Sequence, residues 1–142
     1  MHDSLSDCLF CRLVRGEIPS HRVYEDDHTL AFLDIAPVAM GHTLVIPKHH
    51  AATMFDCSPT DLGYWIMAVQ RVMRCVSKAV SISDITLLQN NGEASGQVIP
   101  HLHMHVIPRT CQDGLRHWPS GLRPTPEELA ALAERMRSFH GE

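Results

Sequence analysis

The chain has 142 residues, a net charge of −4 at pH 7 and 44% hydrophobic residues, which suits one domain with a single core. Its basic residues are scattered, which argues against a groove for a nucleic acid polymer, because such a groove neutralises many phosphates at once. No apolar run approaches the roughly 20 residues that cross a bilayer, and residues 1–7 do not look like a signal or transit peptide. We therefore expect one domain over residues 1–142, in the cytoplasm and without membrane contact.

The first half of the chain predicts one short helix and three strands. Asp7 is placed to cap the helix and Gly16 to end it. The next two segments are β-prone and joined by a short polar turn, as in a hairpin, and Pro47 stops the third strand. We expect the helix at residues 8–16 and the strands at 21–25, 29–33 and 42–46.

The second half predicts a long helix, two strands and a final helix. Ser58 can cap the long helix, with Pro59 at its first position. Its apolar residues recur at steps of three and four and predict one buried stripe, formed by Leu62, Ile66, Val69, Met73 and Val76. We expect helices at 59–79 and 126–139 and strands at 85–89 and 101–108. This order of elements predicts an α+β domain with a mostly antiparallel sheet.

Three histidines alternate with apolar residues in the last predicted strand. His101, His103 and His105 would share one face of that strand, and the apolar residues between them would share the other. Three interpretations are open: a polar outer face, a metal site with three histidine ligands, or catalysis by an imidazole that its neighbours orient. The preceding loop, residues 90–97, is rich in glycine, asparagine and backbone donors that could surround phosphate oxygens, which favours catalysis on a phosphate.

The chain resembles the histidine triad superfamily over nearly its whole length. The motif His101–Ile107 resembles the signature of that superfamily. Four further motifs occur in the order found in the family, and within it the chain is similar to the bacterial Hint-like nucleotide-binding branch. These motifs are Cys8–Cys11 with Gly16–Pro19, Phe32–Pro37, Gly41–Lys48, and Gln89–Gly92 leading to Gly96–Gln97.

The resemblance implies a five-stranded antiparallel sheet with two main helices on one side, and a homodimer whose sheets join. It also implies a hydrolase of purine nucleoside phosphoramidates, of the adenosine 5'-monophosphoramidase kind. Such an enzyme attacks the α-phosphate, forms a covalent nucleotidyl-histidine intermediate and releases a nucleoside monophosphate.

Carried over by position, the resemblance implies a role for each of several residues. His103 would be the nucleophile, His105 would stabilise charge on the phosphate, and His42 would support the nucleophile. Asp34 would accept the ribose hydroxyls. Phe32 and Ile35 would flank the base, and the phosphate would contact Asn90, Gly96 and Gln97.

Three positions bear on how far the resemblance extends. At Val98 many relatives have a hydroxyl that can meet the leaving group, which valine cannot replace. Pro100 stands where an aromatic residue is often found. Trp118 resembles a C-terminal tryptophan that reaches the active site in some relatives, although an exposed loop would explain it equally well.

Cys8 and Cys11 have the spacing of a chelating pair. They could also be two buried helix residues, and a redox pair is less favoured because no strand precedes them. The resemblance implies a structural zinc ion with His50 and His101 as the remaining ligands, although His49 could replace its neighbour.

Two other functions stay open at this point. A dinucleoside polyphosphate hydrolase would use the same nucleophile with a nucleotide as leaving group. A nucleotide-binding regulatory protein would bind the same ligand with little catalysis.

Overall fold

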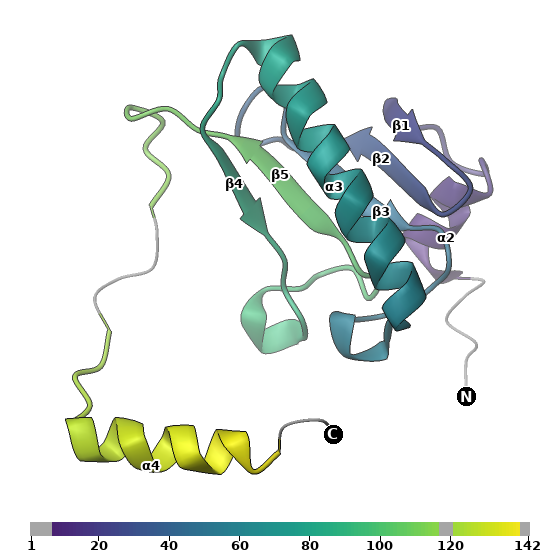
Figure 1. Ribbon diagram of the computed structural model, residues 1–142. Coiled ribbons are helices and arrows are strands. Elements are labelled where there is room, and N and C mark those ends of the chain that lie inside the picture. The colour runs from purple at the N-terminus through teal and green to yellow at the C-terminus, as the bar shows by residue number, and fades with distance from the viewer. Residues whose placement is uncertain (1–6, 117–120, 140–142) are drawn as a thin grey trace.

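The computed structural model describes residues 7–116 and 121–139, and its centre is a five-stranded antiparallel sheet (Figure 1). The strands lie in the order β1-β2-β3-β5-β4, and each neighbouring pair is antiparallel. This confirms the predicted α+β class. The strands are β1 (Arg22–Glu25), β2 (Thr29–Leu33), β3 (Thr43–Pro47), β4 (Ile85–Leu88) and β5 (Met104–Pro108).

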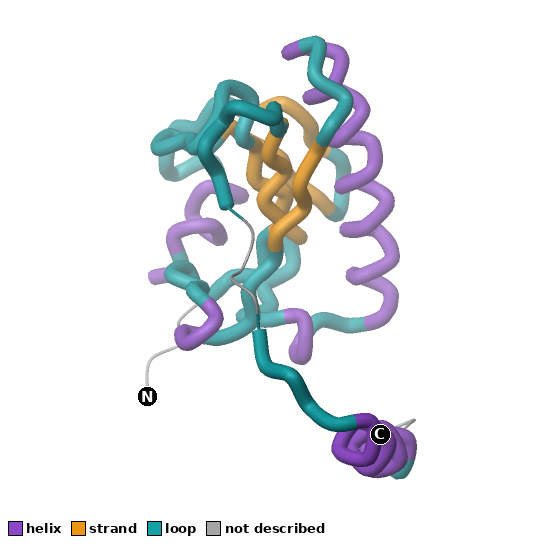
Figure 2. The backbone as a smooth tube through the Cα atoms, turned by 90° about the vertical axis from the view of Figure 1, so that its left-hand side faces the viewer, coloured by secondary structure: helices purple, strands orange, loops and turns teal. Residues whose placement is uncertain are grey.

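Two helices cover opposite faces of this sheet. Helix α3 (Pro59–Val80) packs on one face and the short α2 (Leu9–Val14) on the other, with the strands between them (Figure 2). The sheet has one hydrophobic core on each face, and alternate strand residues belong to one or the other. Ala31 and Val45 belong to the core with α3, while Leu30, Phe32, Leu44 and Ile46 belong to the core with α2. The expectation of helices on one side was therefore wrong, because the central strands are apolar on both faces.

Helix α3 buries a face that differs from the predicted stripe. Its fully buried residues are Trp65, Ala68, Val69, Val72 and Val76. Ile66 is 49% exposed, so including it in the stripe was wrong. The large Trp65 ring takes the centre of the buried face, and its Nε1 donates a hydrogen bond to the Val45 carbonyl at 2.9 Å. This bond fixes the helix to the central strand β3.

Most predicted elements lie within about two residues of their observed positions, with two corrections. Cys8, and not Asp7, caps α2, because its Sγ accepts a hydrogen bond from the Cys11 N–H. Strand β5 begins at Met104 and not at His101. The ladder stops there because Pro47 on β3 has no N–H to donate and its carbonyl accepts a bond from the His101 ring.

Gly41 is required where the chain enters β3. Its φ is +97°, and a Cβ at this position would lie 2.9 Å from a Val80 methyl group at the end of α3. Any side chain would therefore push α3 away from the sheet, besides adopting a backbone conformation that favours glycine.

The C-terminal helix α4 (Pro126–Arg137) lies apart from the sheet at the end of an extended segment (Figure 1). Thr125 and Glu128 form a capping box at its start, and none of its residues is buried. Trp118, whose role the sequence left open, lies outside the described residues. Within the described part of the chain, every helix is too short or too polar to cross a bilayer.

Substituting Trp65→Phe should lower the free energy of unfolding by about 2–3 kcal/mol, because it removes a buried hydrogen bond and leaves a small cavity. Urea denaturation measures this change. The half-exposed neighbour is the control: Ile66→Ala should change stability by less than about 1 kcal/mol. Equal losses in the two variants would contradict the observed face of α3.

Candidate functional site

A cavity of about 350 Å³ lies between α2 and the sheet. Its walls are mainly apolar, and Asp34, His103 and His105 provide polar groups, a combination typical of small-molecule sites. The cavity brings together six of the predicted nucleotide-binding residues: Phe32, Asp34, Ile35, Gly96, His103 and His105. Ile35 is 90% exposed and stands at the opening.

One wall of this cavity was missed by the sequence reasoning. It comes from α2 and the segment that follows, through Leu9, Leu13, Ile18 and Ser20. The four-residue spacing of the two leucines was the available signal. Ser20 has a buried Oγ without a hydrogen-bond partner in the described structure, a group that a bound base or a water molecule would satisfy.

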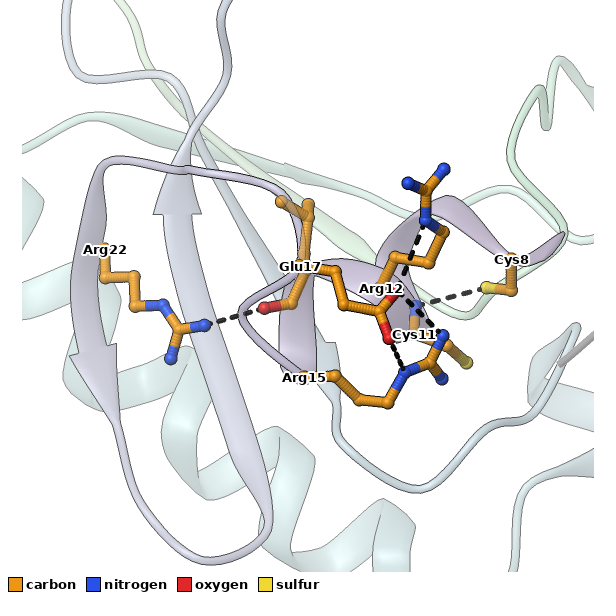
Figure 3. A network of polar contacts seen from close by, with 7 residues as sticks. Cys8, Cys11, Arg12, Arg15, Glu17 and Arg22 are labelled. Carbon is orange, nitrogen blue, oxygen red and sulfur yellow. Dashed lines mark hydrogen bonds and ion pairs between the residues drawn. The ribbon is translucent and has the colours of Figure 1, made fainter. Parts of the chain in front are cut away.

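Polar contacts hold this wall in place (Figure 3). Glu17 accepts hydrogen bonds from Arg15 at 2.7 Å and from Arg12 at 3.4 Å, which closes the end of α2. Arg22 on β1 donates to the Leu13 carbonyl at 2.7 Å. The exposed ion pairs contribute little stability individually, but the Arg22 bond joins α2 to the sheet.

His103 is oriented by the backbone. Its Nδ1 lies 2.7 Å from the His101 carbonyl oxygen, and because a carbonyl only accepts, Nδ1 carries the proton. In the neutral ring the lone pair is therefore on Nε2. The side chain is 6% exposed, lines the cavity and contacts the Phe10 ring edge-on. A buried imidazole with a free lone pair is suited to nucleophilic attack.

His105 is oriented by His42. The Val38 N–H donates to Nδ1 of His42 at 3.2 Å, so the proton of His42 is on Nε2. That Nε2 lies 2.9 Å from Nδ1 of His105 and donates to it. His105 therefore carries its proton on Nε2 and can donate a hydrogen bond from it. Its ring centroid is 5.1 Å from that of His103.

Burial keeps these two rings uncharged. Burial lowers the pKa of His105 to about 4, with the neighbouring His103 and His42 as further causes. Burial also lowers the pKa of His42, against the opposing effect of Asp34. A neutral His42 agrees with its geometry, since the Val38 N–H occupies the nitrogen that a second proton would need.

Asp34 serves the turn and the cavity together. Its Oδ1 accepts a hydrogen bond from the Ala36 N–H at 2.8 Å, so the turn that the sequence suggested is present. Its Oδ2 lies 3.5 Å from Nε2 of His42, and the residue lines the cavity. One carboxylate oxygen thus keeps capacity to accept hydrogen bonds from a ligand.

The triad histidines do not form an exposed row. His101 is fully buried and His103 nearly so, because α2 covers this face of the sheet. The interpretation as a polar outer face is therefore wrong. The predicted alternation does hold for Leu102, Met104 and Val106, which all join the α3 core.

The loop over residues 90–97 uses several of its donors in hydrogen bonds within the protein. The N–H groups of Ser95, Gly96 and Gln97 all bond within the loop. The Gln97 amide donates to the Ala52 and Ile99 carbonyls and accepts from Gly92. The expected cradle of backbone N–H groups is thus closed at these positions, and Gln97 supports the loop. Asn90 lies beside Gly96, where a Cβ would be 3.4 Å from its amide nitrogen.

A second cluster, formed by Cys8, Cys11, His50 and His101, has the geometry of a metal site. Its four candidate ligand atoms lie within 4.8 Å of one another. Nδ1 of His101 is 3.3 Å from the Cys8 sulfur and 3.2 Å from Nδ1 of His50. Zinc bonds of roughly 2.0–2.3 Å place tetrahedral ligands about 3.3–3.8 Å apart, so these residues fit the ion. His49 points elsewhere, to Asp61.

The surroundings of His101 fit metal binding as well. Its Nε2 donates to the Pro47 carbonyl at 2.8 Å, just as most metal-bound histidines donate the N–H of the nitrogen that does not bind the metal. The lone pair is therefore on Nδ1, which faces the cluster. Burial lowers the pKa of His101 to about 4. Asp34, His42 and His105 form another group of potential ligands. A metal on Nε2 of His42 would require the ring proton on Nδ1. That nitrogen instead accepts a hydrogen bond from the Val38 N–H, so the geometry does not favour a metal there.

Comparison with known proteins shows which proteins the chain is similar to. The HIT domain matches residues 15–112. The chain is 41% identical over 133 residues to adenosine 5'-monophosphoramidase hnt1 of Schizosaccharomyces pombe, covering 92% of this chain and 96% of that protein. It is 42% identical over 110 residues to adenylylsulfatase HINT3 of Arabidopsis thaliana, covering 78% and 56%. A crystal structure of a HIT family member from Bacillus subtilis superposes with a TM-score of 0.89 at 34% identity, covering 96% of this chain and 99% of that one.

The lowered pKa of His105 predicts acid sensitivity of the fold. The unfolded chain takes up protons near the ordinary pKa of 6.5, whereas folded His105 takes them up only near 4. Its contribution to stability is therefore full above pH 6.5 and decreases as the pH falls toward 4. With any metal chelated, replacing His105→Gln should reduce the loss of unfolding free energy across this range by about 1–2 kcal/mol. Denaturation at several pH values measures the unfolding free energy, with the exposed His21→Gln as control. Equal slopes of unfolding free energy against pH in the two variants would contradict this prediction.

Proposed function

The chain belongs to the HIT domain family, and from this premise we propose that it hydrolyses purine nucleoside phosphoramidates at the α-phosphate. The observation that carries the proposal is the pair of oriented imidazoles that line the cavity. His103 has its lone pair on Nε2, and His105, whose ring centroid is 5.1 Å away, has its proton on Nε2. Two relatives, named as an adenosine 5'-monophosphoramidase and an adenylylsulfatase, support a nucleotide hydrolase.

In the proposed reaction, His103 Nε2 attacks the α-phosphorus as the bond from phosphorus to the amine nitrogen breaks. The leaving nitrogen keeps the electron pair of the broken bond, takes up a proton from water and departs as the free amine. Water then attacks the nucleotidyl-histidine, which releases nucleoside monophosphate and restores the imidazole. The His101 carbonyl accepts a hydrogen bond from Nδ1–H of His103, with 2.7 Å between nitrogen and oxygen. It stabilises the positive charge that His103 carries in the intermediate.

The neighbours of His103 would bind and orient the nucleotide. His105 would donate its Nε2 proton to a phosphate oxygen, where negative charge develops in the transition state. His42 would act as a positioning residue, because it fixes the tautomer of His105. Asp34 would accept the ribose hydroxyls, and Phe32 and Ile35 would flank the purine.

We propose that Asn90 contacts the phosphate through its side-chain amide. Gly96 lines the cavity and would touch the phosphate without donating a hydrogen bond, because its N–H is bonded to the Glu93 carbonyl.

The alternatives receive less support from the cavity. The described residues lining it include no lysine or arginine, the side chains that would hold the additional phosphates of a dinucleoside polyphosphate. A purely regulatory nucleotide-binding protein would not need a lone pair on His103 Nε2 together with a proton on His105 Nε2.

We also propose that the cluster of Cys8, Cys11, His50 and His101 holds a structural zinc ion. Four protein ligands would leave no open position for substrate. Zinc would cross-link α2, which forms a wall of the cavity, to the segment that carries His103. The HIT domain match begins at residue 15, after both cysteines, so this proposal depends on the geometry of the cluster.

The homodimer and the cytoplasmic location stay predictions. β4 is an edge of the described sheet, and Leu87 and Leu88 on it are 39% and 43% exposed. An unpaired edge with apolar residues is suited to continuing the sheet into a second copy.

Replacing His103→Ala should abolish release of AMP from adenosine 5'-phosphoramidate, a loss of at least about a thousandfold, while AMP binding is retained. Chromatographic product assays and calorimetry measure the two quantities. His49→Ala is the matched control, since this exposed histidine bonds to Asp61 and not to the site, and it should keep wild-type activity. Undiminished turnover in His103→Ala would refute the mechanism.

Freshly purified protein should contain one zinc ion per chain. Cys8→Ser combined with Cys11→Ser should remove the metal and lower the melting temperature, because structural zinc contributes folding energy. Elemental analysis and thermal denaturation test this, with the exposed Cys75→Ser as control. Wild-type protein without bound metal, or full zinc in the double variant, would disprove the site.

A further inference from the structure

A second cleft of about 570 Å³ adjoins the nucleotide cavity. Gly96 and Val98 line both hollows, so the segment that carries them separates the cavity holding His103 from this neighbouring space. The remaining walls come from the segments around Thr53, Glu93 and Pro100. A group attached to a phosphorus beside His103 has this cleft directly within reach.

The walls of the cleft are held in fixed positions. The Gln97 amide donates to the Ala52 carbonyl at 2.7 Å and accepts from the Gly92 N–H at 2.8 Å, so one side chain ties both sides together. The Met54 N–H donates to the Asn91 side chain at 2.8 Å, which adds a second bond across it. The cleft is therefore formed before a ligand arrives, which reduces the entropy lost on binding.

The lining has a distinct chemistry. Val98, which is 84% exposed, and Pro100 offer apolar contact. Glu93 is the one charged residue among the described residues lining the cleft. A carboxylate attracts a cation and repels an anion, and no basic side chain in this lining offsets it. The cleft is thus suited to an apolar stem that carries a positive charge.

We propose that this cleft, the Glu93 cleft, is the leaving-group subsite and selects phosphoramidates of cationic amines. The proposal rests on the proposed function, and it assigns a use to the position where valine replaces a hydroxyl. Val98 would contact the methylene groups of the departing amine, and Glu93 would pair with a distal ammonium group. When the phosphorus–nitrogen bond breaks, the amine leaves through the open side of the cleft.

The test compares three adenosine 5'-phosphoramidates of equal length. Their amines are a diamine with a free ammonium end, a simple alkylamine, and an amino acid ending in a carboxylate. In wild type, kcat/KM should be about two- to fivefold higher for the cationic than for the neutral substrate, and lowest for the anionic one. The preference should weaken as salt screens the charges.

Substituting Glu93→Gln should remove most of this preference, and Glu93→Lys should reverse it in favour of the anionic substrate. Glu127→Lys, the same change of charge on the distant helix α4, is the matched control and should keep the wild-type order. The same order of substrates in wild type and Glu93→Lys would overturn the subsite. Folded protein with no turnover of any phosphoramidate would instead overturn the proposed function, and the subsite with it.

Discussion

The site depends on backbone groups that decide which nitrogen of each histidine carries a proton. The His101 carbonyl places the proton of His103 on Nδ1, and the Pro47 carbonyl places that of His101 on Nε2. The Val38 N–H donates to Nδ1 of His42 and so places the proton of His42 on Nε2. That Nε2 donates to Nδ1 of His105, which places the proton of His105 on Nε2. One ring thus presents a lone pair to the cavity and its neighbour a proton. Without these backbone partners, three adjacent imidazoles could exchange roles and none would be pre-organised.

The layering of the fold makes these partnerships possible. Apolar residues on both faces of the central strands let α3 and α2 pack on opposite sides, and α2 buries the histidine face. Burial then keeps His42 and His105 neutral through their lowered pKa values. The cluster around Cys8 joins α2 to the segment just before His103, so the proposed metal would stabilise the cavity from outside it. Rigid support around a reacting group is what preserves its geometry.

Alternation and spacing are local signals, and they predicted most of the sheet and the shared face of the histidines. The resemblance to the histidine triad superfamily implied the other cavity residues, such as Asp34 and Phe32. Alternate histidines correctly placed Leu102 and Met104 in the α3 core. The errors arose where distant groups compete. The last strand was predicted to start at His101, but the His101 ring bonds to the Pro47 carbonyl and the strand starts at Met104. The loop was predicted to surround phosphate oxygens, but three of its N–H groups bond within the loop. Its Gln97 side chain bonds to Ala52, which is far away in the sequence. The α2 wall and the Glu93 cleft depend on tertiary packing and have no motif.

The tautomers of the histidines are the most direct test of this account. A two-bond ¹H–¹⁵N correlation spectrum of uniformly labelled protein at neutral pH reports the protonated nitrogen of each ring, with signals assigned through single His→Gln variants. The account predicts that His103 is protonated on Nδ1 and His105 on Nε2. His103 protonated on Nε2 would place a proton where the attacking lone pair has to be, and would contradict the proposed chemistry at its first step.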